Sequence, residues 1–75
     1  MSRHGVPAPT QWFKLVAPGV VNAPHILFGY APLPSGGVWI TMRDTRTGAT
    51  HEMPCSNPER AGQRTFQWAS THRLL

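Results

Sequence analysis

The sequence predicts a small, mostly β domain: a small antiparallel sheet or an SH3-like or OB-like barrel, with a short helical turn near residues 58–64. Three observations lead to this prediction. Proline and glycine are frequent, with 8 and 7 residues among 75, and so many helix breakers exclude a helical bundle. Short runs of β-branched and aromatic residues alternate with these breakers, which is typical of short strands joined by turns. A chain this short allows one small domain at most.

That domain is expected over residues 11–72. Residues 1–10 contain two prolines, one glycine and a single large aliphatic side chain, so we expect a disordered tail there, and a flexible end at residues 73–75. No apolar run reaches the roughly 18 residues of a membrane span, and the first residues lack the apolar stretch of a signal peptide. The single cysteine cannot form an internal disulfide, which favours an intracellular protein.

Two strands are expected in the first half of the domain. Residues 11–16 (QWFKLV) predict the first, which ends at the Ala-Pro-Gly turn signal at 17–19. Residues 25–30 (HILFGY) predict the second, with apolar side chains at alternate positions. The Asn-Ala-Pro run at 22–24 is expected to separate the two strands. The following run at 31–37 (APLPSGG) is expected to be a loop.

The strongest hairpin signal covers residues 38–53. Its first strand, 38–43 (VWITMR), alternates between an apolar and a mixed face. The apolar face consists of Val38, Ile40 and Met42. The run at 49–53 (ATHEM) returns as the partner strand. Asp44 is expected to cap the turn between them, and Gly48 to take the left-handed conformation that closes a bulged loop.

The last third of the chain is ambiguous. Asn57 followed by Pro58 predicts a helix start. Residues 65–72 (TFQWASTH) alternate as in a strand, but one set of residues also fits a helical spacing. That set is Ala61, Thr65, Trp68, Ala69 and His72. We expect a strand, because Gly62 interrupts the helical pattern and threonine and aromatic residues favour sheets.

The charge is sparse but one-sided. Seven basic residues face three acidic ones, for a net charge of +4, which favours an acidic partner such as nucleic acid or an acidic protein face. Arginine and tryptophan are enriched at binding hot spots. The residues expected to contact the partner are therefore Trp39, Arg43, Arg46, Arg60 and Arg64. The alternative interpretation is that the charge keeps a small domain soluble and that these arginines only solvate loops.

No catalytic or metal-binding pattern stands out. The four histidines lie more than twenty residues apart in sequence, unlike the short spacings of zinc sites. A nucleophilic site would require Cys55 to pair with His51 or His72 and to use Asp44 for orientation, and 75 residues leave little room for a pocket. We therefore expect no enzyme, no metal and no other cofactor, and we expect Cys55 to be a small packing residue.

In length, basicity and Pro/Gly-rich β character, the chain resembles the small bacteriophage regulators that bind bacterial RNA polymerase, prevent promoter engagement and promote antitermination. Arginine outnumbers lysine six to one, which fits a GC-rich bacterial or phage genome. The resemblance covers the whole chain and not a particular motif, so it assigns no residue role. It implies a monomeric transcription regulator in the cytoplasm of a bacterial host, with the host polymerase as its partner.

A small RNA- or single-stranded-DNA-binding β-barrel is the alternative function. Trp39 and Arg43 lie on the same face of one expected strand, where the indole could stack on a base and the guanidinium could contact a phosphate. The sequence contains no RNP motif, GXXG loop or helix-turn-helix pattern. Composition alone leaves protein and nucleic acid open as partners.

Overall fold

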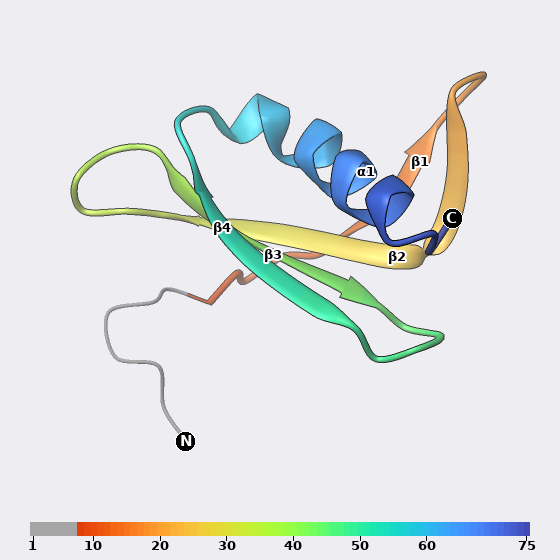
Figure 1. The fold of residues 1–75 in the computed structure, drawn as a ribbon. Coiled ribbons are helices and arrows are strands. Elements are labelled where there is room, and N and C mark those ends of the chain that lie inside the picture. The colour runs from red at the N-terminus through yellow and green to blue at the C-terminus, as the bar shows by residue number, and fades with distance from the viewer. Residues whose placement is uncertain (1–7) are drawn as a thin grey trace.

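The computed structural model describes residues 8–75, which form four antiparallel strands with a helix packed across one face of their sheet (Figure 1). In chain order the elements are β1 (Phe13–Ala17), β2 (Val21–Pro32), β3 (Val38–Asp44), β4 (Thr50–Cys55), the 3₁₀ turn η1 (Pro58–Arg60) and α1 (Ala61–Thr71). The prediction of a mostly β fold is confirmed. Residues 1–7, most of the expected tail, lie outside the described part of the chain.

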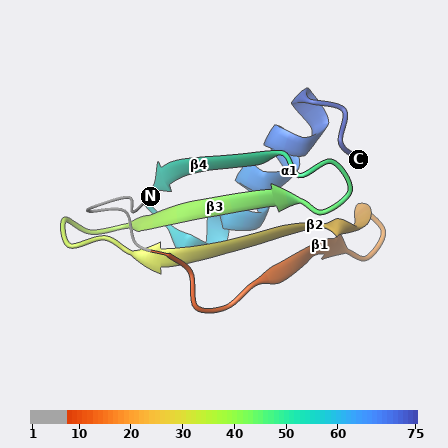
Figure 2. The ribbon, with the colours of Figure 1, turned by 90° about the horizontal axis from the view of Figure 1, so that it is seen from below.

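The strands follow one another in the sheet in the order β1-β2-β3-β4 (Figure 2). Within residues 8–75, β1 and β4 lie at opposite edges and do not pair with each other, so the sheet is open. The expected small antiparallel sheet is therefore confirmed, and the SH3-like or OB-like barrel is wrong. Closing a barrel would require the two edge strands to meet, whereas here α1 covers the concave face (Figure 1).

The hairpin expected over residues 38–53 is confirmed, with β3 and β4 paired antiparallel. Asp44 caps the turn as expected. Its carboxylate accepts hydrogen bonds from the Arg46 amide and from the Thr47 hydroxyl, each at 2.9 Å. Gly48 has a φ of +82°, a left-handed conformation that glycine adopts at little cost. Local turn chemistry therefore sets the register of this half of the sheet.

The core lies between α1 and the face of the sheet that it covers. The three β3 side chains expected to face inward are all buried, namely Val38, Ile40 and Met42. From the helix, small residues at Ala61, Thr65 and Ala69 face the sheet together with Trp68. The buried Thr65 hydroxyl donates a hydrogen bond to the Ala61 carbonyl oxygen at 2.8 Å, so it enters the core without an unpaired donor.

The strand expected over residues 65–72 is wrong, because most of this segment belongs to α1. As a helix it presents its small residues to the sheet in one stripe, which a strand with period two cannot do. Gly62 does not end the helix. The Phe28 ring packs on it, with an atom 3.4 Å from where a Cβ would lie. The helical start expected at Asn57 is confirmed for η1, which precedes α1: the Asn57 side chain accepts a hydrogen bond from the Glu59 amide at 2.9 Å.

β2 is longer than expected, because it continues through the Asn-Ala-Pro run at 22–24. The pairing of β1 with β2 shifts between Lys14 and Leu15, and three β2 residues, 24–26, lie opposite this step. The proline among them has no amide hydrogen for the ladder, and the irregular step keeps it out of regular pairing. The break that we expected therefore becomes a β-bulge within one long strand.

Replacement of Ile40 by alanine tests the core. Ile40 is fully buried in the middle of β3, so Ile40→Ala should lower the free energy of unfolding by about 2–5 kcal/mol. The matched control is Thr50→Ala on the exposed edge strand, which should change the stability by less than about 0.5 kcal/mol. Urea unfolding followed by tryptophan fluorescence measures both. Equal small effects of the two variants would contradict this core.

Candidate functional site

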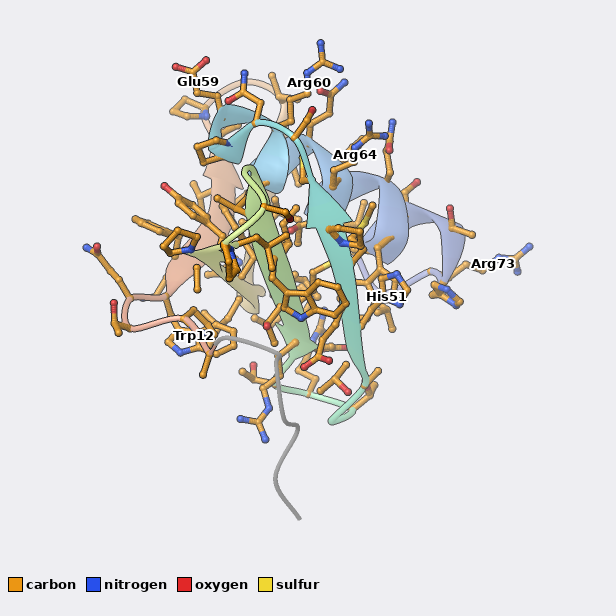
Figure 3. All side chains as sticks on the ribbon, turned by 90° about the vertical axis from the view of Figure 1, so that its left-hand side faces the viewer. Trp12, His51, Glu59, Arg60, Arg64 and Arg73 are labelled. Carbon is orange, nitrogen blue, oxygen red and sulfur yellow. The ribbon has the colours of Figure 1, made fainter. Side chains whose placement is uncertain are left out.

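The five residues expected to contact a partner fall into separate groups. Trp39 and Arg43 alternate with the buried residues of β3, so they share the open face of the sheet, away from α1. Arg46 lies in the turn after β3. Arg60 directly precedes α1 and makes no side-chain capping hydrogen bond, and Arg64 lies in the first turn of α1, both on the helix side of the molecule (Figure 3). The structure brings Trp39 and Arg43 onto one face and separates Arg60 and Arg64 from them.

A row of residues crosses the open face and carries two cations. By register, Lys14 of β1, Leu27 of β2 and Arg43 of β3 lie side by side, and we call them the basic row. Neighbouring strands are about 4.8 Å apart, so the backbones of the two basic residues are about 10 Å apart. The three carboxylates of the chain are at positions 44, 52 and 59. β1 and β2 therefore carry none.

The segment before β1 covers the middle of the open face. Gly29 of β2 is buried beneath it, and a Cβ there would lie 2.6 Å from the Pro9 Cβ and 2.7 Å from the Gln11 carbonyl oxygen. Glycine is therefore the residue that lets the two segments approach so closely. Trp39 shares this face and is half-buried, and its indole nitrogen has no hydrogen-bond partner among the described residues. The middle of the face is not free for a ligand.

Exposed apolar side chains gather on and around β1. Four large apolar residues in this region are well exposed, namely Trp12 (42%), Phe13 (36%), Val16 (48%) and Val20 (77%). Elsewhere in the described chain, the large apolar residue with comparable exposure is Leu75 at 49%. Contiguous exposed apolar surface marks interaction sites in soluble proteins. These four residues, with Lys14, form what we call the β1 surface.

The two edges of the sheet differ in how well they could accept another strand. β4 carries Pro54, which cannot donate a backbone hydrogen bond, and Glu52, a charge on the edge. Proline and charged residues on an edge strand oppose pairing with another chain. β1 contains no proline and a single charge, Lys14. Of the two edges in residues 8–75, β1 is therefore the one whose sequence permits strand addition.

Our sequence reasoning gave the aromatic face around Trp12 only as the alternative to the arginine surface, although a signal for the β1 surface was present. Residues 11–16 alternate imperfectly, because Trp12 and Val16 lie on one side of the strand and Phe13 and Leu15 on the other. In an edge strand only one side can face the core. Apolar residues on both sides therefore indicate a strand that leaves some of them exposed, and Leu15 is the one that becomes buried.

The groups considered for metal binding and catalysis do not converge. Within residues 8–75, no set of three or more His, Cys, Asp or Glu side chains is placed to hold a metal ion. His51 and His72 instead lie against Trp68, each with its ring centroid 6.2 Å away. They line a shallow groove between β4 and α1, together with Arg64. Cys55 is buried, and its sulfur donates to a backbone carbonyl oxygen at 3.2 Å.

Asp44 carries the buried carboxylate that holds the β3–β4 turn, with a side chain 1% exposed. Burial raises the pKa of this carboxyl, but the hydrogen bonds from the Arg46 amide and the Thr47 hydroxyl lower it. The neighbouring charges of His25 and Arg46 lower it as well. The net pKa of Asp44 lies below its ordinary value of 3.8, because these donors and cations favour the ionised form.

The C-terminal residues are tied to the same end of the sheet. The His25 Nε2 donates a hydrogen bond to the Leu74 carbonyl oxygen at 2.6 Å, and the Leu74 amide donates to the Ala69 carbonyl oxygen at 2.8 Å. From the turn, the Thr45 amide and hydroxyl both donate to the His25 carbonyl oxygen. β2, the β3–β4 turn and the segment after α1 are thus joined next to the basic row.

Comparison with family models, with curated proteins and with solved structures finds no match to this chain. The helices of residues 8–75 are all too short and too polar to cross a membrane. The β1 surface and the basic row are therefore interpreted from their own geometry.

Replacement of Gly29 by alanine tests how the open face is covered. The added methyl group would overlap Pro9 and the Gln11 carbonyl oxygen, so Gly29→Ala should release the segment before β1 while the sheet stays folded. The amide ¹⁵N relaxation of residues 8–12 should then report faster motion than in the wild type. Thr41→Ala, the cross-strand neighbour on the same face, is the control and should leave these amides unchanged. Unchanged relaxation in both variants would contradict this packing.

The pH dependence of stability tests the Asp44 cap. Its pKa is lower in the folded protein than in the unfolded chain, so it contributes stability above the unfolded value, about 3.9. That contribution is lost as the pH falls through the lower folded pKa. Asp44→Asn should therefore be less stable than the wild type between pH 5 and 8, and the difference should shrink below about pH 4. Urea unfolding across this range measures it, and a constant difference down to pH 2 would contradict the cap.

Proposed function

We propose that this chain is a small, non-enzymatic interaction protein that binds an acidic protein segment through the β1 surface and the adjoining basic row. One observation carries the proposal: the exposed large apolar side chains lie on the edge strand that permits strand addition and on the residues beside it. Exposed apolar surface is costly to keep in water, at about 25 cal/mol per Å². A partner that covers this surface gains that free energy on binding.

The charge of this region selects the kind of partner. Lys14 lies within the β1 surface and Arg43 two strands away in the same row. Glu52 of β4, opposite Thr41, puts one carboxylate on the open face. Because β1 and β2 carry none, the field at the β1 edge attracts negative charge and disfavours basic partners. Trp12 adds a residue type common at interface hot spots. Together these features favour an acidic segment that also presents apolar side chains.

The resemblance to phage regulators suggests a partner to test first, bacterial RNA polymerase. On this proposal the protein modulates transcription by occupying a surface of the host enzyme. Of the residues expected from sequence to make the contact, Arg43 lies in the basic row, whereas Arg60 and Arg64 lie on the helix side. We therefore assign the contact to Lys14 and Arg43 with the apolar residues around β1.

Single-stranded nucleic acid is the second candidate partner. The observation in its favour is that Trp39 and Arg43 share the open face with Lys14, an arrangement of aromatic and basic side chains that could hold bases and phosphates. Against it, the segment around Pro9 covers the middle of that face. A strand of nucleic acid would have to displace this segment or bind beside it.

A charge-reversal experiment tests the proposed function. The double variant Lys14→Glu with Arg43→Glu should weaken binding to purified bacterial RNA polymerase at least tenfold, because both cations would become repulsive to an acidic segment. The matched control is Arg60→Glu with Arg64→Glu, which makes the same change of charge on the helix side. It should bind within about twofold of the wild type. Titration calorimetry measures the affinities, and thermal melting checks that both variants fold.

Three outcomes would count against parts of the proposal. Equal loss in both double variants would show a general charge effect and no defined surface. Absence of polymerase binding by the wild type would remove that partner. Tight binding of a single-stranded oligonucleotide, with an affinity that falls steeply with salt, would favour the second candidate.

A further inference from the structure

An apolar groove lies between β1, the start of β2 and α1. It has a volume of about 350 Å³ and is lined mainly by the apolar side chains Leu15, Val21, Phe28 and Phe66. Lys14, Val20 and Gln63, all exposed, also line it and form its rim. This volume is at the small end of the range for ligand sites. It suits one bulky side chain better than a large cofactor.

Gly62 is the residue of α1 that lines the groove without contributing a side chain to it. A Cβ there would lie 3.4 Å from the tip of the Phe28 ring, which is ordinary van der Waals contact. A larger side chain at this position would therefore compete with the Phe28 ring for the space that lines the groove. Glycine at this position also makes the helix less stable than alanine would. Because Gly62 has no side chain, its part of the groove lining stays open.

The groove adjoins the β1 surface. Its lining includes Lys14 and Val16 of the edge strand and Val20 of the following turn, which are also the exposed residues of that surface. Successive side chains of a strand point to opposite faces. A segment added alongside β1 would thus place every second side chain on the face that α1 and the groove occupy, with its remaining side chains toward the open face and the basic row.

We infer that the groove is an anchor pocket for one bulky aliphatic or aromatic side chain of an extended, acidic peptide segment that adds to β1 as a fifth strand. The inference rests on the proposed function and specifies how the partner is recognised. Backbone hydrogen bonds along the edge supply general affinity, and the pocket selects the side chain that enters it. The two cations of the basic row, Lys14 at the rim of the groove and Arg43, select acidic residues on either side of the anchor.

Selection from a random peptide library tests the inference. A library of twelve-residue peptides is selected on the wild-type protein, and the enriched peptides are then titrated against Gly62→Leu, which fills the groove. Ser70→Leu is the matched control, because it adds the same side chain at an exposed position of α1. Enriched peptides should carry a large apolar residue flanked by aspartate or glutamate. They should bind Gly62→Leu at least tenfold more weakly and Ser70→Leu unchanged.

A second measurement does not depend on a variant. Addition of an enriched peptide to the wild-type protein should shift the methyl resonances of Leu15, Val20 and Val21 at the groove, and leave those of Ile40 in the core unchanged. Peptides that bind Gly62→Leu as tightly as the wild type, without shifting groove methyls, would overturn the anchor pocket. If these peptides still bound the double variant Lys14→Glu with Arg43→Glu more weakly than the wild type, the proposed function would be supported although the anchor pocket was wrong. Enrichment of basic peptides, or of none, would overturn the inference.

Discussion

The structure depends on one short helix as the cover for a much longer sheet. α1 has 11 residues that rise about 1.5 Å each, whereas β2 has 12 residues that rise about 3.3 Å each, so the strand is about twice as long as the helix. Small residues on the buried side of α1 bring it close to β2 and β1, and the fully buried side chains Ile40 and Met42 of β3 belong to the same core. The helix leaves the edge strand β1 and the turn after it partly uncovered, and Val16 and Val20 are exposed there. The exposed apolar residues and the groove both lie where this cover ends.

Two polar devices hold the sheet around that helix. The Asp44 carboxylate fixes the β3–β4 turn from inside, and His25 joins the same end of the sheet to Leu74 after the helix. Such hydrogen bonds matter in this protein because a chain of 75 residues buries only a small apolar core. At the other end, Asn57 caps η1 just before α1. The β1–β2 turn has no side-chain cap among the described residues; the Val20 amide closes it with a hydrogen bond to the Ala17 carbonyl oxygen at 2.9 Å, and Gly19 takes a left-handed conformation with a φ of +76°.

The same arrangement separates the two sources of binding specificity that the protein offers. Apolar contact is available on β1 and in the groove beside α1, and positive charge on the open face at Lys14 and Arg43. An edge strand is the element that reaches both faces, because its successive side chains alternate between them. The shift in pairing lies between Lys14, which belongs to the basic row, and Leu15, which lines the groove. A partner strand along β1 would therefore contact the groove with the side chains on one of its faces and the basic row with those on the other.

The sequence alone determined what depends on neighbours along the chain. The alternation at residues 38–43 set the buried face of β3, and Asp44 with Gly48 set its turn, because hairpin register follows from local pattern and turn chemistry. Tertiary structure decided the rest. Residues 65–72 satisfied both periods, and the helix formed because only that form presents a stripe of small residues to the sheet. Likewise, the exposure of β1 and the groove at Gly62 follow from where α1 ends relative to β2, which no local pattern records.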